Sequence, residues 1–231
     1  ITLFLFFISL KLHTIAPFLI RVYNLINKVN LYIKCIKIYK EVFIMKLPIA
    51  LSNKHVHLSQ ADVDALFGEG YQLTPFKPLS QPGQYACEEK VTVVGPKGQQ
   101  TMRVLGPVRP ESQVEVSLAD ARGLGLAVPV RQSGDVEGTP AFKLVGPKGE
   151  VECQKGIIVA ARHIHMSLED AEKFGVKDKD VVSVKTEGLR GLTFHNVLVR
   201  ASEKFALEMH VDIEEGNAAG VKNGDLVELI K

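Results

Sequence analysis

Short runs in which apolar and polar residues alternate dominate residues 45–231, and Gly and Pro separate these runs. This pattern is typical of β-strands joined by turns, and it predicts a mainly β fold with few long helices. Four of the runs end at a Ser or Asp that an acid follows three positions later, as at a helix N-terminus. We therefore expect short helices that begin at Ser59, Ser117, Ser167 and Asp212. The sequence VGPKG, at 94–98 and again at 145–149, predicts two hairpin turns.

The chain also matches itself. HVHLSQAD at 55–62 corresponds to HIHMSLED at 163–170, and VEVSLADA at 114–121 corresponds more weakly to MHVDIEEG at 209–216. Self-similarity in the same order predicts an internal duplication and two similar small domains. Two positions before each expected helix start stands His57, Glu115, His165 or His210. Four equivalent junctions thus carry a side chain that is able to bind a metal.

Two His-x-His pairs carry the clearest chemistry. Residues i and i+2 of a strand point to the same face, so His55 projects together with His57, and the same holds for the second pair. Two imidazoles on one face favour a divalent metal, zinc above all. The repeat then supplies a third candidate ligand for each pair, and three protein ligands leave one position open, as in catalytic zinc sites. The alternative is that these histidines are ordinary polar side chains of surface strands. The two predicted clusters are His55, His57 and Glu115, and His163, His165 and His210.

Five other residues have a more limited interpretation. Arg109 lies between two prolines just before Glu115, and a rigidly held guanidinium is a good phosphate receptor; the alternative is an exposed loop arginine. Asp212 is expected to cap a helix, and the alternative is that it accepts a hydrogen bond from a ligand imidazole and so orients that ring. His195 has no partner in the sequence pattern and is expected on the surface or in packing. Cys87 and Cys153 have no neighbour that would activate them as nucleophiles.

Charge and cysteine content limit the function classes. The 231 residues include 28 Lys and Arg and 26 Asp and Glu, which gives a net charge of +2. Residues 1–44 hold six of these bases and one acid, so 22 bases and 25 acids, or −3, remain in 45–231. This balance excludes a general affinity for nucleic acid. The three cysteines, at 35, 87 and 153, show no pairing pattern, which favours a reducing, cytoplasmic compartment.

Residues 1–44 differ from the rest of the chain. No basic stretch precedes the apolar run ITLFLFFISL, and Lys11, His13 and Pro17 soon interrupt it, so neither a signal peptide nor a membrane span is indicated. We expect this segment to be an extension that results from a start assigned too far upstream, with Met45 as the native start. The alternative is a targeting peptide, because 22–36 place apolar residues at the spacing of a basic amphipathic helix. For 45–231 we expect no membrane association.

Four segments resemble the phosphate propanoyltransferase family, the phosphotransacylases of propanediol utilisation. The segments are SNKHVHL (52–58), LGPVRPESQVEVS (105–117), ARHIHMS (161–167) and HVDIEEGNA (210–218). The resemblance implies two similar antiparallel β-barrel domains with short helices and a site with two zinc ions per chain between them. The first barrel would comprise 55–160, and the second 161–231 together with 45–54. The implied reaction interconverts a short-chain acyl-CoA and phosphate with an acyl phosphate and free coenzyme A.

The resemblance assigns roles to the same residues that the repeat selects. His55, His57 and Glu115 would hold one zinc, and His163, His165 and His210 the other, while Arg109 would bind phosphate. Lys54 stands where the family usually has Arg, and Gly216 where Ala is common. Some members are packaged in a bacterial microcompartment, so shell association is one expectation for this chain, and a homodimer is another. The preference for propanoyl or acetyl groups stays open.

Two other functions fit the same ligands. A two-metal hydrolase of thioesters or phosphoesters would use water in place of phosphate, and it would release product from acyl-CoA without added phosphate. A non-catalytic shell or metal-binding module would bind metal without any turnover.

Overall fold

In the computed structural model, residues 25–31, 33 and 45–230 are described. The chain divides into two units, 1–45 and 46–231, and each is described by itself. Within the first unit, residues 25–31 and 33 are helical, in agreement with the amphipathic helix expected over 22–36, whose other residues lie outside the described part. The interpretation of 1–44 as an extension also falls mostly outside the described residues and stays a prediction. No helix among the described residues has the length and apolar character needed to cross a bilayer.

Six strands of residues 46–231 close into a barrel. Four of its strand pairings are antiparallel and two are parallel, because β1 runs parallel to β14 and β11 runs parallel to β13. Around the barrel the order is β1-β14-β11-β13-β12-β15. The strands are β1 (Lys46–Ser52), β11 (His163–Met166), β12 (Val181–Lys185), β13 (Thr193–Ala201), β14 (Glu208–Asp212) and β15 (Leu226–Ile230).

The other strands form a nine-stranded sheet that stays open, in the order β7-β10-β6-β2-β5-β4-β8-β9, with β3 paired to β4. The mainly β fold with short helices is confirmed, and one of its two sheets is a closed barrel while the other is a partial one. The strands are β2 (His55–His57), β3 (Pro75–Pro78), β4 (Tyr85–Val94), β5 (Gln99–Gly106), β6 (Gln113–Glu115), β7 (Val130–Arg131), β8 (Phe142–Val145), β9 (Glu150–Cys153) and β10 (Ile157–Ala160).

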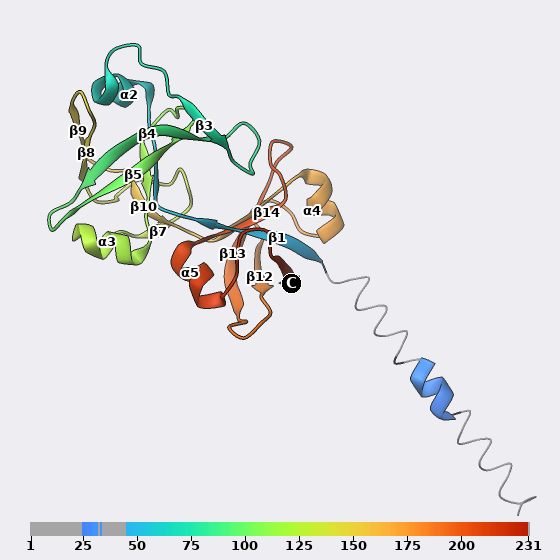
Figure 1. Cartoon of the computed structure of the whole chain (residues 1–231). Coiled ribbons are helices and arrows are strands. Elements are labelled where there is room, and N and C mark those ends of the chain that lie inside the picture. The colour runs from blue at the N-terminus through green and yellow to red at the C-terminus, as the bar shows by residue number, and fades with distance from the viewer. Residues whose placement is uncertain (1–24, 32, 34–44, 231) are drawn as a thin grey trace, which may run out of the picture. The chain divides into compact units, whose positions relative to one another are not determined.

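At two places in the chain, consecutive strands belong to different sheets. β1 leads directly into β2 but belongs to the closed barrel, where it pairs with β14 and β15. β10 leads directly into β11 but belongs to the open sheet, where it pairs with β6 and β7. In Figure 1, β1 accordingly lies beside β14 of the chain's second half. The placement of β1 agrees with the expected second domain, although 46–231 form one compact unit and the division into two domains stays a prediction.

The two halves share a pattern of strand pairing around the His-x-His strands. β2 is parallel to β5 and antiparallel to β6, just as β11 is parallel to β13 and antiparallel to β14. A duplicated unit would give this correspondence, and the duplication itself stays a prediction.

Four short helices begin where the sequence predicts them. They are α2 (Gln60–Phe67), α3 (Leu118–Leu124), α4 (Leu168–Phe174) and α5 (Ile213–Ala219). Ser59, Ser117, Ser167 and Asp212 each accept a hydrogen bond from the backbone N–H three residues on, and the last three belong to complete capping boxes. A side chain that satisfies a free N–H fixes where a helix starts, so each helix begins immediately after its strand. Because the cap fixes where each helix starts, it also fixes the position of the strand residues that directly precede the helix.

Both VGPKG segments form the predicted hairpin turns, between β4 and β5 and between β8 and β9. Each turn also packs against a helix end: the Lys97 N–H donates to the Leu124 carbonyl, and the Lys148 N–H donates to the Leu66 carbonyl, both at 3.0 Å. A Cβ atom at Gly95 would collide with the Leu124 carbonyl oxygen. The turns therefore need glycine because helix backbone approaches them closely.

Alternating strand residues fill the interior of each sheet. In β1, for example, Leu47 and Ile49 are fully buried while their neighbours are less so, as the period of two requires. A single apolar cluster joins the open sheet to α2 and α3 through Val56, Leu58, Leu66, Val104, Val114, Leu124, Leu144 and Ile157. The buried Val56 and Val114 thus anchor β2 and β6 in this cluster. The side chains just before and after each of them therefore point to the opposite face of the sheet.

Candidate metal and phosphate site

The structure brings the six predicted ligands together in two groups of three. In each group the ligand atoms lie within 4.8 Å of one another. The strand register explains the convergence, since His55 on β2 stands opposite Glu115 on β6, and His163 on β11 stands opposite His210 on β14. The second histidine of each pair, two residues further along its strand, points to the same face. We call these groups the first cluster (His55, His57, Glu115) and the second cluster (His163, His165, His210).

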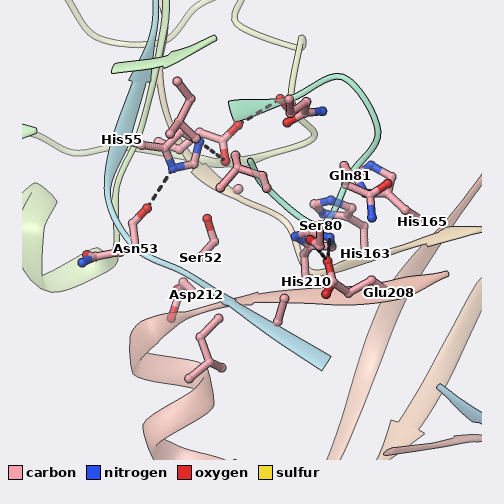
Figure 2. Close-up of a pocket in the computed structure, with 18 of the residues that line it drawn as sticks. Ser52, Asn53, His55, Ser80, Gln81, His163, His165, Glu208, His210 and Asp212 are labelled. Atoms are coloured by element: carbon pink, nitrogen blue, oxygen red, sulfur yellow. Dashed lines mark hydrogen bonds and ion pairs between the residues drawn. The ribbon is translucent and has the colours of Figure 1, made fainter. Parts of the chain in front are cut away.

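The first cluster is nearly closed to solvent. His55 and His57 are 8% and 3% exposed, and the His55 Nε2 lies 3.5 Å from the Glu115 Oε2. The His55 Nδ1 pairs with the Asn53 carbonyl at 2.8 Å, which orients the ring and leaves Nε2 for a ligand (Figure 2). The His57 Nδ1 is buried and has no partner among the described residues.

Hydrogen bonds hold the Glu115 carboxylate in place. Its Oε1 accepts from the Gln113 Nε2 at 2.7 Å and from the Ser133 hydroxyl at 2.9 Å. The Gln113 Nε2 also lies 2.8 Å from the Ser133 Oγ, and the Gly134 N–H donates to the Gln113 Oε1 at 2.7 Å. Burial alone would raise the pKa of Glu115, but the adjacent His55 and His57 and the Ser133 hydrogen bond outweigh burial and lower this pKa. Glu115 is therefore an oriented carboxylate.

The second cluster consists of three rings in mutual contact. The rings of His163 and His210 are stacked with centroids 5.2 Å apart, and the ring of His165 meets them edge-on at 4.6 and 5.0 Å. The His163 Nδ1 pairs with the Ala161 carbonyl at 2.9 Å, as His55 does with Asn53 in the first cluster. The Oε2 of Glu208 lies 3.0 Å from the His210 Nε2, yet not in hydrogen-bonding geometry, and it accepts a hydrogen bond from the Ser80 hydroxyl (Figure 2).

The donor atoms suit a divalent metal such as zinc. Three buried imidazole nitrogens have no hydrogen-bond partner in the described part of the chain: His57 Nδ1, His165 Nδ1 and His210 Nε2. Burial lowers the pKa of His57 and of His165 to about 2, and it also lowers the pKa of His163. A neutral imidazole with a free nitrogen is the form that binds metal, and buried polar atoms without partners are costly unless a ligand satisfies them. Both clusters could therefore hold a cation.

Both clusters and Arg109 line one cavity of about 710 Å³. The backbone N–H of Arg109 donates to the Leu58 carbonyl at 2.8 Å, and its guanidinium donates to the Ser133 Oγ at 3.2 Å. Ser133 thus joins Arg109 to Glu115. Burial lowers the pKa of Arg109, while the carboxylate of Glu115 opposes this shift. The predicted phosphate-binding arginine is half-buried at the first cluster rather than exposed on a loop.

The base that precedes each His-x-His pair binds the helix that follows the third ligand. The Lys54 Nζ lies 2.7 Å from Asp120 in the first turn of α3, and the Arg162 Nε lies 2.8 Å from Glu215 in the first turn of α5. These ion pairs connect β2 to α3 and β11 to α5. They help to fix the distance between the histidine pair and its third ligand.

The remaining sequence-predicted residues lie as follows. Asp212 caps α5 by accepting the Glu215 N–H at 2.8 Å, and the acid beside His210 is Glu208 instead. His195 is exposed, and its Nδ1 pairs with the Ser183 hydroxyl at 2.9 Å. Burial raises the pKa of Cys87 to about 11 and that of Cys153 to about 12, so both stay protonated thiols, in agreement with the prediction that neither is a nucleophile.

Sequence reasoning missed four residues of the cavity region: Gln113, Ser133, Arg200 and Glu208. Gln113 and Glu208 each stand two residues before a predicted ligand, so the period of a strand could have indicated them. Ser133 and Arg200 lie outside every repeated segment, and nothing in the local pattern distinguishes them.

The fold and the cavity define a mainly β protein in which two three-ligand clusters and an arginine surround one site. A model of the phosphate propanoyltransferase family matches residues 48–222. The chain belongs to this family and is an acyltransferase.

Curated relatives cover most of the chain and carry the same name. A phosphate propanoyltransferase of Thermotoga maritima is 57% identical over 185 residues, which is 79% of this chain and 88% of that protein. One of Clostridioides difficile is 53% identical over 84% of this chain and 92% of its own length. One of Salmonella typhimurium is 51% identical over 81% of this chain and 90% of its own length.

Proposed function

We propose that this protein interconverts a short-chain acyl-CoA and phosphate with an acyl phosphate and free coenzyme A. The observation that carries the proposal is that two three-residue clusters with the donor atoms for a metal and a half-buried arginine line one cavity. The relatives are named for a propanoyl group, so propanoyl-CoA is the first substrate to test, with acetyl-CoA second. The proposed substrates and products are small molecules: an acyl-CoA, phosphate, an acyl phosphate and coenzyme A.

We propose zinc at both clusters, two ions per chain. His55, His57 and Glu115 would hold the first ion, and His163, His165 and His210 the second. When bound, the ions would supply fixed positive charge for the negative charge that develops on the carbonyl oxygen and on the departing sulfur. The carboxylate of Glu115 and the neutral imidazoles offer lone pairs without first losing a proton.

Arg109 would bind and orient the phosphate. Its fork can donate to two oxygens at once, and Ser133 holds the fork beside Glu115. A phosphate oxygen would attack the thioester carbonyl carbon, the new C–O bond would form, and the C–S bond would break with its electron pair leaving on the coenzyme A thiolate. Holding phosphate and thioester in one cavity replaces a bimolecular encounter by an oriented one. Neither Cys87 nor Cys153 is among the described residues that line the cavity, which favours this direct transfer over a covalent cysteine acyl-enzyme.

One assay tests the proposal. Free thiol should appear from propanoyl-CoA only when phosphate is present, and acyl phosphate should form in equal amount. Chelation should abolish this activity, and added zinc should restore it. Thiol release without phosphate would contradict the proposal and indicate a hydrolase, while metal binding without turnover would indicate a binding module. Comparison of propanoyl-CoA with acetyl-CoA decides the preferred acyl group.

The predictions of a cytoplasmic location, microcompartment association and a homodimer remain predictions. Cell fractionation tests the first two, and sedimentation of the purified chain tests the third.

A further inference from the structure

Arg200 is a second arginine at the cavity, and it lies beside the second cluster. On β13 it is the register partner of His165 on β11, and its side chain is half-buried in the cavity wall. The guanidinium lies over the ring of Phe205, 5.7 Å from the centroid, and this ring is 4.3 Å from that of His165. One aromatic ring therefore supports both the guanidinium and a candidate ligand, which fixes the position of Arg200 relative to the second cluster.

The other half-buried cations of the cavity wall have polar partners within the chain. Lys54 pairs with Asp120, Arg103 donates to the Cys87 carbonyl, and Arg109 donates to Ser133. The guanidinium of Arg200 has neither an ion pair nor a hydrogen bond within residues 46–230. A guanidinium carries five N–H donors, and those of Arg200 are not among the side-chain nitrogens that are buried without a partner, so they stay accessible from the cavity. An oxyanion that enters the cavity would satisfy them.

The charges at the cavity also call for an anion. Arg200 helps to lower the pKa of Arg109, so the two guanidinium groups are close enough to repel each other. Burial lowers the pKa of both arginines, and the Glu115 carboxylate opposes this shift in each, as Asp178 also does for Arg200. Gln113 and Ser133 already hold the Glu115 carboxylate, and Asp178 accepts the Ala201 N–H at 3.0 Å. Two arginines that line one cavity beside carboxylates with other partners suit a doubly charged ligand.

We propose that Arg200 is a second phosphate-binding residue, which holds the phosphoryl group of phosphate or acyl phosphate from the side opposite the first cluster while Arg109 holds it beside Glu115. This inference deepens the proposed function and rests on it for the identity of the anion. The phosphates of coenzyme A are the competing anions. The pantetheine arm separates them from the thioester, whereas Arg200 lies next to His165, where the reacting atoms would be.

Binding of inorganic phosphate to the metal-loaded full chain, measured by calorimetry, tests the proposal directly. The variants are Arg200→Gln and Arg200→Lys, and Arg122→Gln, an exposed arginine of α3, is the matched control. Loss of one charge-assisted contact of about 1.5–3 kcal/mol corresponds to roughly 10- to 100-fold weaker phosphate binding. We expect this loss for Arg200→Gln, a smaller loss for Arg200→Lys, and none for the control, with metal content and melting temperature unchanged.

Turnover then separates the two anions. The KM for phosphate should rise in Arg200→Gln as much as binding weakens, while the KM for propanoyl-CoA stays within twofold. The same rise should persist with propanoyl-pantetheine, which lacks the nucleotide. A defect that disappears with this truncated thioester would assign Arg200 to coenzyme A and overturn the proposal. Unchanged phosphate binding in a folded, metal-loaded Arg200→Gln protein would also overturn it.

Two controls keep the outcomes distinct. If Arg200→Gln folds poorly, Arg200→Lys carries the test, because it keeps the charge and loses only the forked geometry. If wild-type protein binds phosphate in an Arg200-dependent way but releases no thiol from acyl-CoA, the anion site stands and the transferase proposal fails.

Discussion

The hydroxyl of Ser133 joins the proposed phosphate arginine to the proposed metal carboxylate. It donates to the Glu115 Oε1 at 2.9 Å and lies 3.2 Å from the Arg109 Nη1. The substitution Ser133→Ala removes both contacts and creates almost no change in volume. A hydrogen bond to a charged group contributes about 1.5–3 kcal/mol, and the Gln113 Nε2, which still reaches Glu115 at 2.7 Å, retains part of the orientation. We therefore expect metal affinity at the first cluster to fall roughly 10-fold, toward the lower end of the 10–100-fold range for residues that orient ligands.

Competition with a chromophoric chelator measures this affinity without any turnover. Titration should show one of two zinc sites weakened in Ser133→Ala and the other unchanged, and the KM for phosphate should rise in the same protein because Arg109 loses its partner. Ser183→Ala is the matched control, since it also removes a serine hydroxyl from a histidine-containing pair, Ser183 with His195, that does not line the cavity. If Ser133→Ala binds two zinc ions as tightly as the wild type, the assignment of Glu115 as a metal ligand held by Ser133 is wrong.

Three further predictions concern the ligands and the turns. His165→Ala should lose one metal ion per chain by elemental analysis together with activity, whereas His195→Ala should keep both; a fully active, metal-poor His165→Ala would refute the second cluster. Burial lowers the pKa of His57 and His165 to about 2, so between this value and about 6.5 the unfolded chain binds more protons than the folded one. The free energy of unfolding of the metal-free protein should therefore fall by on the order of 1 kcal/mol per histidine for each pH unit below 6.5. Urea titrations at pH 5 and 7 measure this, and equal stability would refute it. Gly95→Ala and Gly146→Ala should each lower the melting temperature by several degrees, because overpacking against a helix carbonyl costs about 1–3 kcal/mol; an unchanged Tm would show that the turns move freely.

The features that the sequence predicted well are local ones. Ser59, Ser117, Ser167 and Asp212 start their helices through hydrogen bonds that span only three residues, so the signal and the structure share one short segment. The six clustered side chains were predictable for the same reason, because strand periodicity places His55 with His57 and the repeat locates the third member. The register between β2 and β6, which sets His55 opposite Glu115, agrees with that selection.

What the sequence did not predict depends on contacts between distant segments. Whether a sheet closes is decided by the pairing of its outermost strands, and no local pattern distinguishes the closed barrel from the open sheet. In the sequence pattern, Arg200 is an ordinary polar position of an alternating strand. Only the pairing of β13 with β11 places it beside His165. Ser133 reaches Glu115 across 18 residues of chain, so its role is visible only in three dimensions.

The pairing of β1 with strands from the second half of the chain has a consequence for cutting the protein into fragments. A break in the linker between β10 and β11 would yield an N-terminal fragment that carries β1 without β14 and β15, its neighbours in the barrel. The C-terminal fragment would retain β11 to β15 with a gap where β1 belongs. The N-terminal fragment would still hold every strand of the open sheet, whereas neither fragment could close the barrel, so the barrel should form only when the two fragments are mixed.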